Sequence, residues 1–331
     1  MGETNRAPLY NSKGNSLIIK KKRDSGEKFG KKGFVKNLKD NYELYLFLLP
    51  AFVYFIVFRY WPMYGLQIAF RKFNGSLGIW GSPWVGLRNF TDFFNSYYFW
   101  VLIKNTIGIT LYSILIGFPI PIIFALMLNE VDNERFKRFV QTVSYAPHFI
   151  STVVIVGIII AFLSPTTGVI NHIIVACGGE TKPFMIMPGW FKSIYVWSGV
   201  WQSMGWSAII YLAALSGIDP QQHEAAVIDG ANRFERIWHI NIPGILPTII
   251  ILLILNMGSI MNVGFEKIYL MQNPLNFEAS DVISTYVYRT GLIDADFSFS
   301  TAVGLFNSVI NFIILIIVNI ISGKASEISL W

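Results

Sequence analysis

Four histidines and one cysteine are the residues of this chain that most often hold metal ions or act as nucleophiles. The histidines are His148, His172, His223 and His239. Their spacing matches no zinc-site motif, and Cys177 alone cannot form a thiolate cluster. The basic glycine cluster at residues 30–32 lacks the upstream glycine and the following Ser or Thr of a phosphate-binding loop. The sequence therefore predicts no catalytic residue, no metal site and no cofactor bound by this chain, so energy for any active process must come from elsewhere.

Polar side chains recur inside stretches that are otherwise apolar. Ser198 and Gln202 are four residues apart, so they share one face of a helix. The whole set is Ser198, Trp201, Gln202, Trp206, Asn256, Ser259, Asn307 and Asn311. Lipid cannot satisfy amides and hydroxyls, so these groups should face protein or water. Two interpretations stay open: the set lines a solute path, with tryptophan faces that suit sugar rings, or its members hydrogen-bond between helices.

The longest polar interruption in the second half of the chain runs from Asp219 to Pro247. Asp219 followed by Pro220 is a helix-start signal, because Asp caps free N–H groups and Pro suits the first helical position. Gly230 permits a turn without a Cβ penalty. We predict a second short helical run over residues 233–240 that ends before the next prolines, since proline removes a donor and clashes with the preceding turn. The expected product is two short helices joined by a bend.

This loop resembles the EAA loop in permease subunits of binding-protein-dependent ABC importers. The matching residues are Glu224-Ala225-Ala226, then Gly230, then Ile240-x-Ile242-Pro243. Asn241 and Ile242 stand where Thr and Leu are more usual. In that family the loop is a cytoplasmic helix pair that seats in a groove of the ATPase subunit. The resemblance thus assigns ATPase coupling to Glu224, Ala225, Ala226, Asp229, Gly230, Ala231 and Pro243. The alternative is an interfacial amphipathic helix without a partner.

Two segments before residue 100 narrow the resemblance to sugar permeases. Trp84-Val85-Gly86-Leu87-Arg88-Asn89-Phe90 resembles the segment before the second span in the carbohydrate class, of the maltose-transporter type. Residues 62–70 resemble the polysaccharide-permease subgroup named after LplB. The alternative is an ordinary belt of aromatic residues at the membrane interface.

The composition is that of an integral membrane protein. Of 331 residues, 53% are hydrophobic and 14% are charged, with a mean hydropathy of +0.49. The net charge of +6 could suggest nucleic acid, but the basic residues crowd into the first forty positions. We therefore expect contact with membrane lipid and no nucleic-acid partner.

A membrane helix needs roughly 20 apolar residues, and six segments qualify. They are Leu44–Tyr60, Val101–Leu128, Thr142–Leu163, Ile194–Leu215, Ile245–Met261 and Thr301–Ser322. The fold expected is an all-α, six-span permease domain of the type I ABC importer class over residues 44–325, with a coupling loop at 219–243. A basic tail, 1–43, and a terminal segment, 326–331, flank it.

Lysine and arginine counts predict a cytoplasmic N-terminus. With that orientation the inside segments hold 17 of these residues and the outside segments hold 8. The loop at 219–243 is then cytoplasmic. The resemblance implies that the protein lies in the cell membrane of a bacterium.

The resemblance implies an oligosaccharide or polysaccharide importer with several partners. These are a second homologous permease, two ABC ATPase subunits that use ATP and Mg, and an extracytoplasmic solute-binding protein. Five acids in the last outside loop, residues 262–300, either contact that binding protein or form a solvated surface. The acids are Glu266, Glu278, Asp281, Asp294 and Asp296.

Other functions remain as alternatives. An ABC permease for amino acids or phosphate is the nearer one, and the segment at 84–90 weakens it. A secondary transporter would need ionisable groups within the spans, of which this chain has almost none.

Overall fold

The computed structural model describes residues 41–326, with side chains as far as Lys324. The predicted basic tail, 1–43, and the terminal segment, 326–331, lie almost wholly outside the described residues. Within 41–326 the regular structure is helical, apart from two isolated β-bridges, Arg71 with Trp84 and Asn74 with Gly78. The chain divides into two packing units at Met63 and Tyr64, and each is described by itself.

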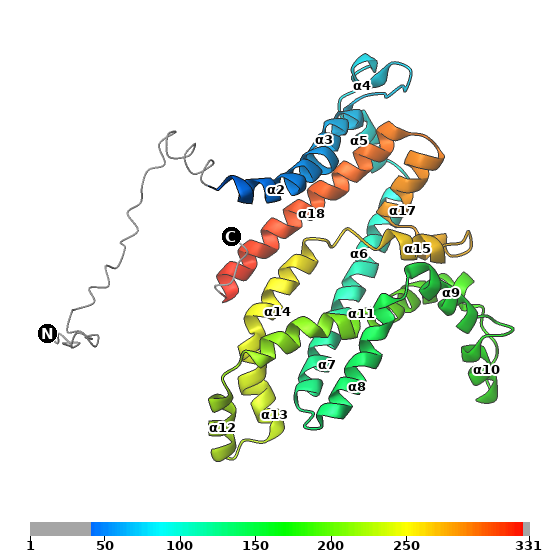
Figure 1. Ribbon diagram of the computed structural model, residues 1–331. Coiled ribbons are helices and arrows are strands. Elements are labelled where there is room, and N and C mark those ends of the chain that lie inside the picture. Colours follow the sequence, from blue (N-terminus) through cyan, green and yellow to red (C-terminus); the bar gives the residue numbers. More distant parts are fainter. Residues whose placement is uncertain (1–40, 327–331) are drawn as a thin grey trace, which may run out of the picture. The chain divides into compact units, whose positions relative to one another are not determined.

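The helices follow in chain order (Figure 1): α2 (Tyr42–Phe55), α3 (Trp61–Met63), α4 (Gly78–Gly81), α5 (Arg88–Phe94), α6 (Tyr98–Gly117), α7 (Pro119–Asn129), α8 (Glu134–Tyr145), α9 (Thr152–Phe162), α10 (Val169–Ala176), α11 (Pro188–Ser216), α12 (Pro220–Ile228), α13 (Arg233–Arg236), α14 (Ile242–Met257), α15 (Phe265–Met271), α16 (Phe277–Ser280), α17 (Ile283–Tyr288) and α18 (Phe297–Ser326). Tighter 3-10 turns occupy Tyr64–Phe70, Ala146–Phe149 and Phe184–Ile186, and wider π-helical turns occupy Ile56–Tyr60, Ile237–Asn241 and Arg289–Ile293.

The first unit is one apolar helical run. Helix α2 buries none of its side chains and continues through the π-helical turn at Ile56–Tyr60 into α3. Large apolar side chains such as Phe47, which is 85% exposed, cover its surface. An apolar helix that is exposed all round is suited to lipid, which replaces a protein core as its apolar environment.

Helix α11 is the centre of the second unit. Its 29 residues begin at Pro188, the position where proline is best tolerated, and contact α6, α7, α8 and α14. Ala208, Tyr211 and Leu215 are buried on one side of it, against Ala125 of α7 and Ile245 of α14. At Gly205 an added Cβ would lie 2.3 Å from the carbonyl oxygen of Ser144 in α8, so only glycine permits this close approach.

Four helical runs in the described range are long and apolar enough to cross a membrane. They are Tyr42–Phe70, Tyr98–Asn129, Arg233–Met257 and Phe297–Lys324. They overlap the first, second, fifth and sixth predicted spans. The fourth predicted span, Ile194–Leu215, lies inside α11, which is not among the four because Trp, Ser and Gly recur along it.

The third predicted span, Thr142–Leu163, is not one helix. Its two halves, Glu134–Phe149 and Thr152–Phe162, meet at an angle of 101° and would make a fifth crossing if counted as one span. Ile150 and Ser151 are extended at the break, and Ser151 caps the second half. The Gln202 side chain donates a hydrogen bond of 3.2 Å to the carbonyl oxygen of Ile150, so α11 satisfies a backbone group that the bend leaves free.

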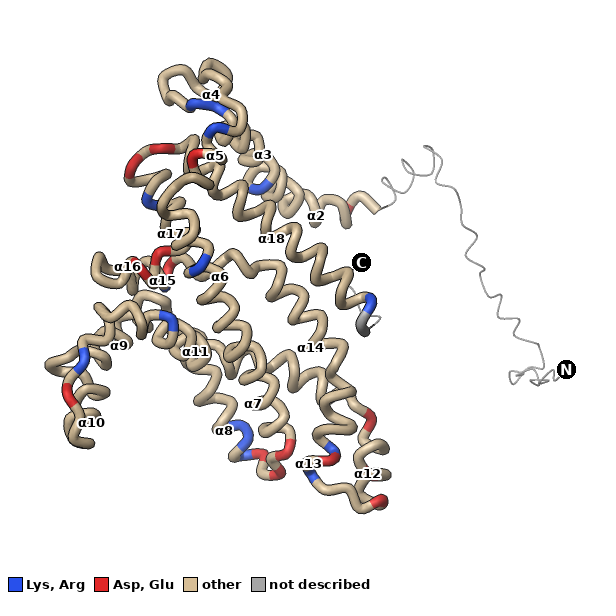
Figure 2. The backbone as a smooth tube through the Cα atoms, turned by 180° about the vertical axis from the view of Figure 1, so that it is seen from behind, with Lys and Arg blue, Asp and Glu red and all other residues tan. Residues whose placement is uncertain are grey.

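Charged residues gather at two ends of the second unit. Figure 2 shows them at the turn between α7 and α8 and on α12 and α13 at one end, and around α5, α15 and α17 at the other, with further charges beside α10 and at the last turn of α18. The turn between α7 and α8 thus lies at the same end as α12 and α13, which belong to the loop predicted to be cytoplasmic (Figures 1 and 2).

Candidate functional site

The loop after α11 is built by local caps. The Asp219 side chain accepts a hydrogen bond from the backbone N–H of Gln221 at 3.0 Å, which confirms the helix start predicted there. At the other end of α12, Ala231 N–H bonds to the Ala226 carbonyl and Gly230 N–H to that of Val227. This pair of bonds is a Schellman motif, and it requires a left-handed residue, which Gly230 supplies with φ +82°. Gly230 therefore fixes the direction of the turn.

The second half of the loop differs from the prediction of a separate short helix. Asn232 and Glu235 form a capping box that starts α13, but the helix then runs on through Ile237–Asn241 into α14 as one helical run, Arg233–Met257. The predicted stop at Pro243 is wrong. The π-helical turn directs the Ile242 N–H to the Ile237 carbonyl, which widens the helix just before Pro243, where an α-helical turn would clash with the ring.

Apolar side chains on this loop are exposed. Helix α12 buries none of its residues, and Glu224 and Ala225 are exposed with them. Ile228 is 86%, Phe234 84% and Trp238 69% exposed. Large apolar groups on a polar, projecting segment are typical of a protein interface. Sequence reasoning missed these three, although the four-residue spacing of Phe234 and Trp238 could have indicated one helix face.

Ion pairs tie the base of the loop to the turn between α7 and α8. Arg236 lies 3.6 Å from Glu130, and both side chains are mostly buried. The buried Asn241 side chain donates to Glu130 at 3.3 Å. Farther out, Arg233 pairs with the exposed Asp132 at 3.0 Å. These contacts fasten α13 and the turn that follows it to the corner between α7 and α8.

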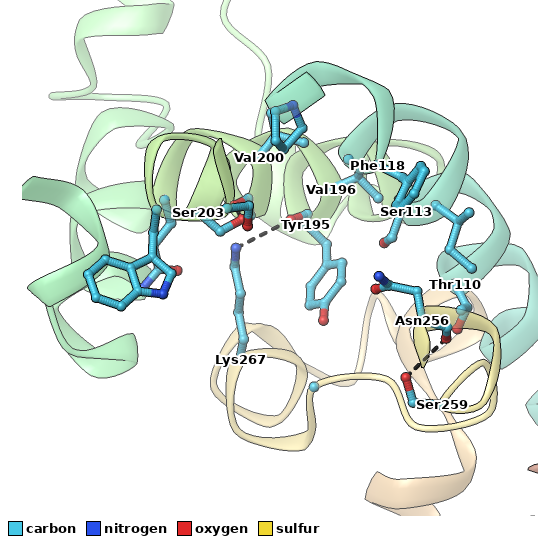
Figure 3. A pocket seen from close by; sticks show the side chains of 18 of the residues that line it. Thr110, Ser113, Phe118, Tyr195, Val196, Val200, Ser203, Asn256, Ser259 and Lys267 are labelled. Atoms are coloured by element: carbon cyan, nitrogen blue, oxygen red, sulfur yellow. Dashed lines mark hydrogen bonds between the residues drawn. The ribbon is translucent and has the colours of Figure 1, made fainter. Parts of the chain in front are cut away.

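A cavity of about 700 Å³ lies beside α11, at the middle of the second unit. Its wall comes from α6, α7, α9, α11, α14 and α15, so residues from 110 to 267 meet there. Figure 3 shows Tyr195 between Lys267 and Asn256, with Thr110 and Ser113 from α6 beside the amide. Hydroxyls, amides and aromatic rings together are the groups that bind sugars, since rings stack on apolar sugar faces and polar groups bond to sugar hydroxyls.

Four of the predicted path residues line this cavity: Gln202, Trp206, Asn256 and Ser259. The Asn256 amide also donates to the carbonyl of Leu252, and the Ser259 hydroxyl donates to that of Asn256. One face of Trp206 is covered by His148, stacked at 4.5 Å between ring centroids. The structure brings these four together, and their role in binding solute stays a prediction.

The other four predicted path residues are not in the wall of this cavity. The Ser198 hydroxyl donates to the backbone carbonyls of Ile194 and Tyr195, and Trp201 is 46% exposed. Asn311 accepts from the backbone N–H of Met261 at 2.8 Å, and Asn307 donates to Asn262 at 2.9 Å. Both asparagines hold the irregular segment after α14, which is the interhelical alternative stated above.

Lys267 of α15 is a cavity residue that sequence reasoning assigned to an outside loop. It is 8% exposed, and its Nζ donates to the Tyr195 carbonyl at 3.3 Å and lies 5.2 Å from the centre of the Tyr195 ring. Burial lowers the pKa of Lys267 from 10.5 to about 8, because the charged form loses hydration. The lysine is therefore still mostly charged at neutral pH. No signal in the sequence separates it from exposed lysines.

The segment from 262 to 300 is only partly a solvated surface. Asp281 is 3% exposed, pairs with Arg289 at 2.6 Å, and its carbonyl accepts from Asn105 of α6. The interpretation of all five acids as loop surface or partner contact is wrong for Asp281, which fastens α16 and α17 to α6. Among the described residues, His, Cys, Asp and Glu form no group of three or more that could hold a metal ion.

Comparisons with known proteins agree with this arrangement. Residues 117–327 match the family described as binding-protein-dependent transport system inner membrane component. Protein LplB of Bacillus subtilis (strain 168) is 44% identical over 315 residues, which cover 95% of this chain and 99% of that protein. The polygalacturonan/rhamnogalacturonan transport system permease protein YteP of the same strain is 43% identical over 297 residues, 90% of this chain and 92% of its own length.

A solved structure extends the similarity to three dimensions. A chain of a bacterial ABC transporter involved in the import of the acidic polysaccharide alginate is 42% identical, with a TM-score of 0.83 over 88% of this chain and 99% of that one. A second structure, that transporter in complex with an alginate pentasaccharide-bound periplasmic protein, gives a TM-score of 0.83 at 41% identity, over 89% of this chain and 99% of that one. With the family match spanning more than half of its length, this chain belongs to the inner membrane components of binding-protein-dependent transport systems and has the type I ABC importer permease fold.

Proposed function

We propose that this chain is a permease subunit of an ABC importer that moves oligosaccharides or polysaccharide fragments into the cytoplasm. The relatives with the highest identity reported above include a polygalacturonan/rhamnogalacturonan permease and an alginate transporter. The observation that carries the proposal is the cavity beside α11, whose wall combines amides, hydroxyls and aromatic rings. A sugar needs that combination, because it has both polar edges and apolar faces.

The proposed topology has six spans and a cytoplasmic N-terminus. Besides the four apolar helical runs, the bent pair of α8 and α9 serves as the third span and α11 as the fourth. A bend and a polar helix at membrane depth are tolerated where they are packed in protein or line a cavity, and α11 does both. In this orientation α12 and α13 face the cytoplasm.

The proposed coupling site is α12 with the first turns of the helix that follows. Glu224, Ala225 and Ala226 on α12, with Asp229, Gly230 and Ala231 at its end, form a projecting, locally capped element. The exposed Ile228, Phe234 and Trp238 supply apolar contact area for an ATPase subunit. Pro243 lies beyond, where the element joins the membrane helix.

The proposed complex contains this chain, a second homologous permease, two ABC ATPases and an extracytoplasmic solute-binding protein. ATP and Mg are bound by the ATPases. Closing of the ATPase pair moves the coupling elements, and the two permeases turn the cavity outward to receive sugar. Hydrolysis reverses the movement and the sugar passes inward. The ion pairs of Arg236 and Arg233 at the α7–α8 corner carry the movement into the helices around the cavity.

The test is to change the coupling element in the complete transporter. Glu224→Lys and Gly230→Pro should leave the chain in the membrane but abolish co-purification of the ATPases and ATP-driven sugar uptake. Gly230→Asn is the matched control, because Asn tolerates φ > 0 and should retain both. Normal ATPase binding by both variants, or sugar uptake by this chain without ATPases, would refute the proposal.

A further inference from the structure

The cavity contains one cation among the described residues that line it. Lys267 comes from α15, and its side chain crosses to α11, as Figure 3 shows. Its neighbour Glu266 also lines the cavity, but Glu266 is exposed and forms no ion pair with Lys267. Within residues 41–326 no carboxylate lies within the 4.0 Å of Nζ that defines an ion pair.

Burial of this ammonium is only partly compensated. One of its three donors bonds to the Tyr195 carbonyl at 3.3 Å, and the Tyr195 ring offers a cation–π contact at 5.2 Å. A buried cation is usually paired, because the loss of hydration costs more than neutral partners return. The remaining donors thus have no anionic partner among the described residues 41–326.

The wall beside the ammonium is open to a ligand. Gly199 of α11 lines the same cavity, and a Cβ added there would lie 3.6 Å from Nζ. A larger side chain at position 199 would therefore cover the charge, whereas glycine leaves it accessible from the cavity. The hydroxyl of Ser203 and the amide of Gln202 lie on the same helix and line the same space. Both can bind hydroxyl groups of a sugar in this cavity.

We propose that Lys267 binds an anionic group of the transported saccharide, so that the substrate is an acidic oligosaccharide that carries carboxylates or sulfate esters. This inference rests on the proposed function, since it assumes that saccharide passes through the cavity. It adds the chemical class of the substrate and the residue that selects it. Lys267 determines specificity, because its positive charge favours a negatively charged saccharide. The amides and hydroxyls of the wall can form hydrogen bonds with acidic and neutral sugars alike.

The experiment uses the complete transporter with its binding protein and ATPases in proteoliposomes. ATP-driven uptake is measured for tetrasaccharides of galacturonate and of alginate uronates, for the methyl-esterified galacturonate tetrasaccharide, for a sulfated galactan tetrasaccharide and for neutral cellotetraose. Wild-type protein should take up at least one acidic probe and prefer it to the neutral ones. Uptake of uronates or of the sulfated probe tells which anion is used.

The variants separate charge recognition from structure. Lys267→Met should lower uptake of the preferred acidic probe by ~10-fold or more, the loss expected for one charge-assisted hydrogen bond. Lys267→Gln, which retains a donor near the Tyr195 carbonyl without the charge, should behave in the same way. Lys267→Arg should restore most of the uptake. Lys182→Met removes an exposed charge that is not part of the cavity wall and should have no effect.

Each failure has its own signature. Uptake of none of the probes would count against the proposed function itself. Preference of the wild type for neutral probes, or unchanged acidic uptake in both neutral variants at position 267, would overturn the role of Lys267 and leave the proposed function standing. An equal loss of acidic and neutral uptake in Lys267→Gln would also overturn it, because that pattern indicates a structural lysine.

Discussion

The loop after α11 and the cavity beside α11 are organised in opposite ways. Every hydrogen bond that shapes α12 joins residues within six positions of each other, through the Asp219 cap and the motif at Gly230. The cavity wall instead comes from six helices between residues 110 and 267, and it depends on contacts such as Gln202 with Ile150. A locally determined element can project and dock without a core, whereas a cavity exists only while distant helices hold their positions.

The largest effect should come from a change that separates α11 from α8. Gly205→Val places a Cβ where the Ser144 carbonyl oxygen lies at 2.3 Å, so the helices must part. We expect destabilisation of about 3 kcal/mol or more and little folded protein. Membrane yield and thermal unfolding in detergent measure it. Gly157→Ala is the control, since a Cβ there meets nothing within 4 Å. Equal stability of the two variants would show that the cavity region does not depend on this contact.

An intermediate effect is expected at the docking surface of the loop, without any loss of fold. Trp238→Ser removes a side chain that is 69% exposed, so stability of the permease should stay unchanged. If Trp238 anchors the ATPase, its loss costs about 2 kcal/mol, or a ~30-fold weaker affinity. Titration of purified ATPase onto the permease complex measures this. Trp80→Ser, which removes a similarly exposed tryptophan from α4, is the control. Equal affinities in both variants would remove Trp238 from the interface.

The smallest effect is a gain in stability with a defined pH dependence. Because the pKa of Lys267 falls from 10.5 in the unfolded chain to about 8, the unfolded state binds the proton more tightly. The lysine therefore destabilises the fold fully below pH 8, and this penalty fades as the pH rises toward 10.5. Lys267→Met removes this penalty but also removes the hydrogen bond to Tyr195. Its free energy of unfolding at pH 7 should therefore exceed that of the wild type by about 1–2 kcal/mol.

Thermal unfolding of the wild type and of Lys267→Met at pH 7 and pH 10 checks this prediction. Glu266 is the other charged residue among the described residues that line the cavity with Lys267, and Tyr195 is the titratable group that Lys267 contacts directly. Glu266→Gln is the control, because this exposed carboxylate should contribute little. An advantage of Lys267→Met that does not shrink between pH 7 and pH 10 would show that desolvation of the ammonium is not its cause.

What the sequence could predict also differs between the loop after α11 and the cavity beside it. The Asp219 helix start and the left-handed Gly230 could be read from residue types, because caps and turns are chemical properties of a few neighbours. The helix end predicted before Pro243 was wrong, because a π-helical turn accommodates the proline ring. No residue type in the sequence indicates such a turn. Asn307 and Asn311 had the right types for a solute path, yet they bond to the segment after α14.

The sequence by itself determined that this is an apolar, helical membrane protein with a polar loop of a recognisable family, because composition and local motifs act over short stretches of chain. Only the tertiary structure decided that Thr142–Leu163 bends, that Asp281 is a buried ion-pair partner and that Lys267 faces the cavity. The physical reason is that burial and charge pairing are set by residues from other helices. A lysine in an outer loop and a lysine in a cavity wall are the same residue type in the sequence, and only the packing around them differs.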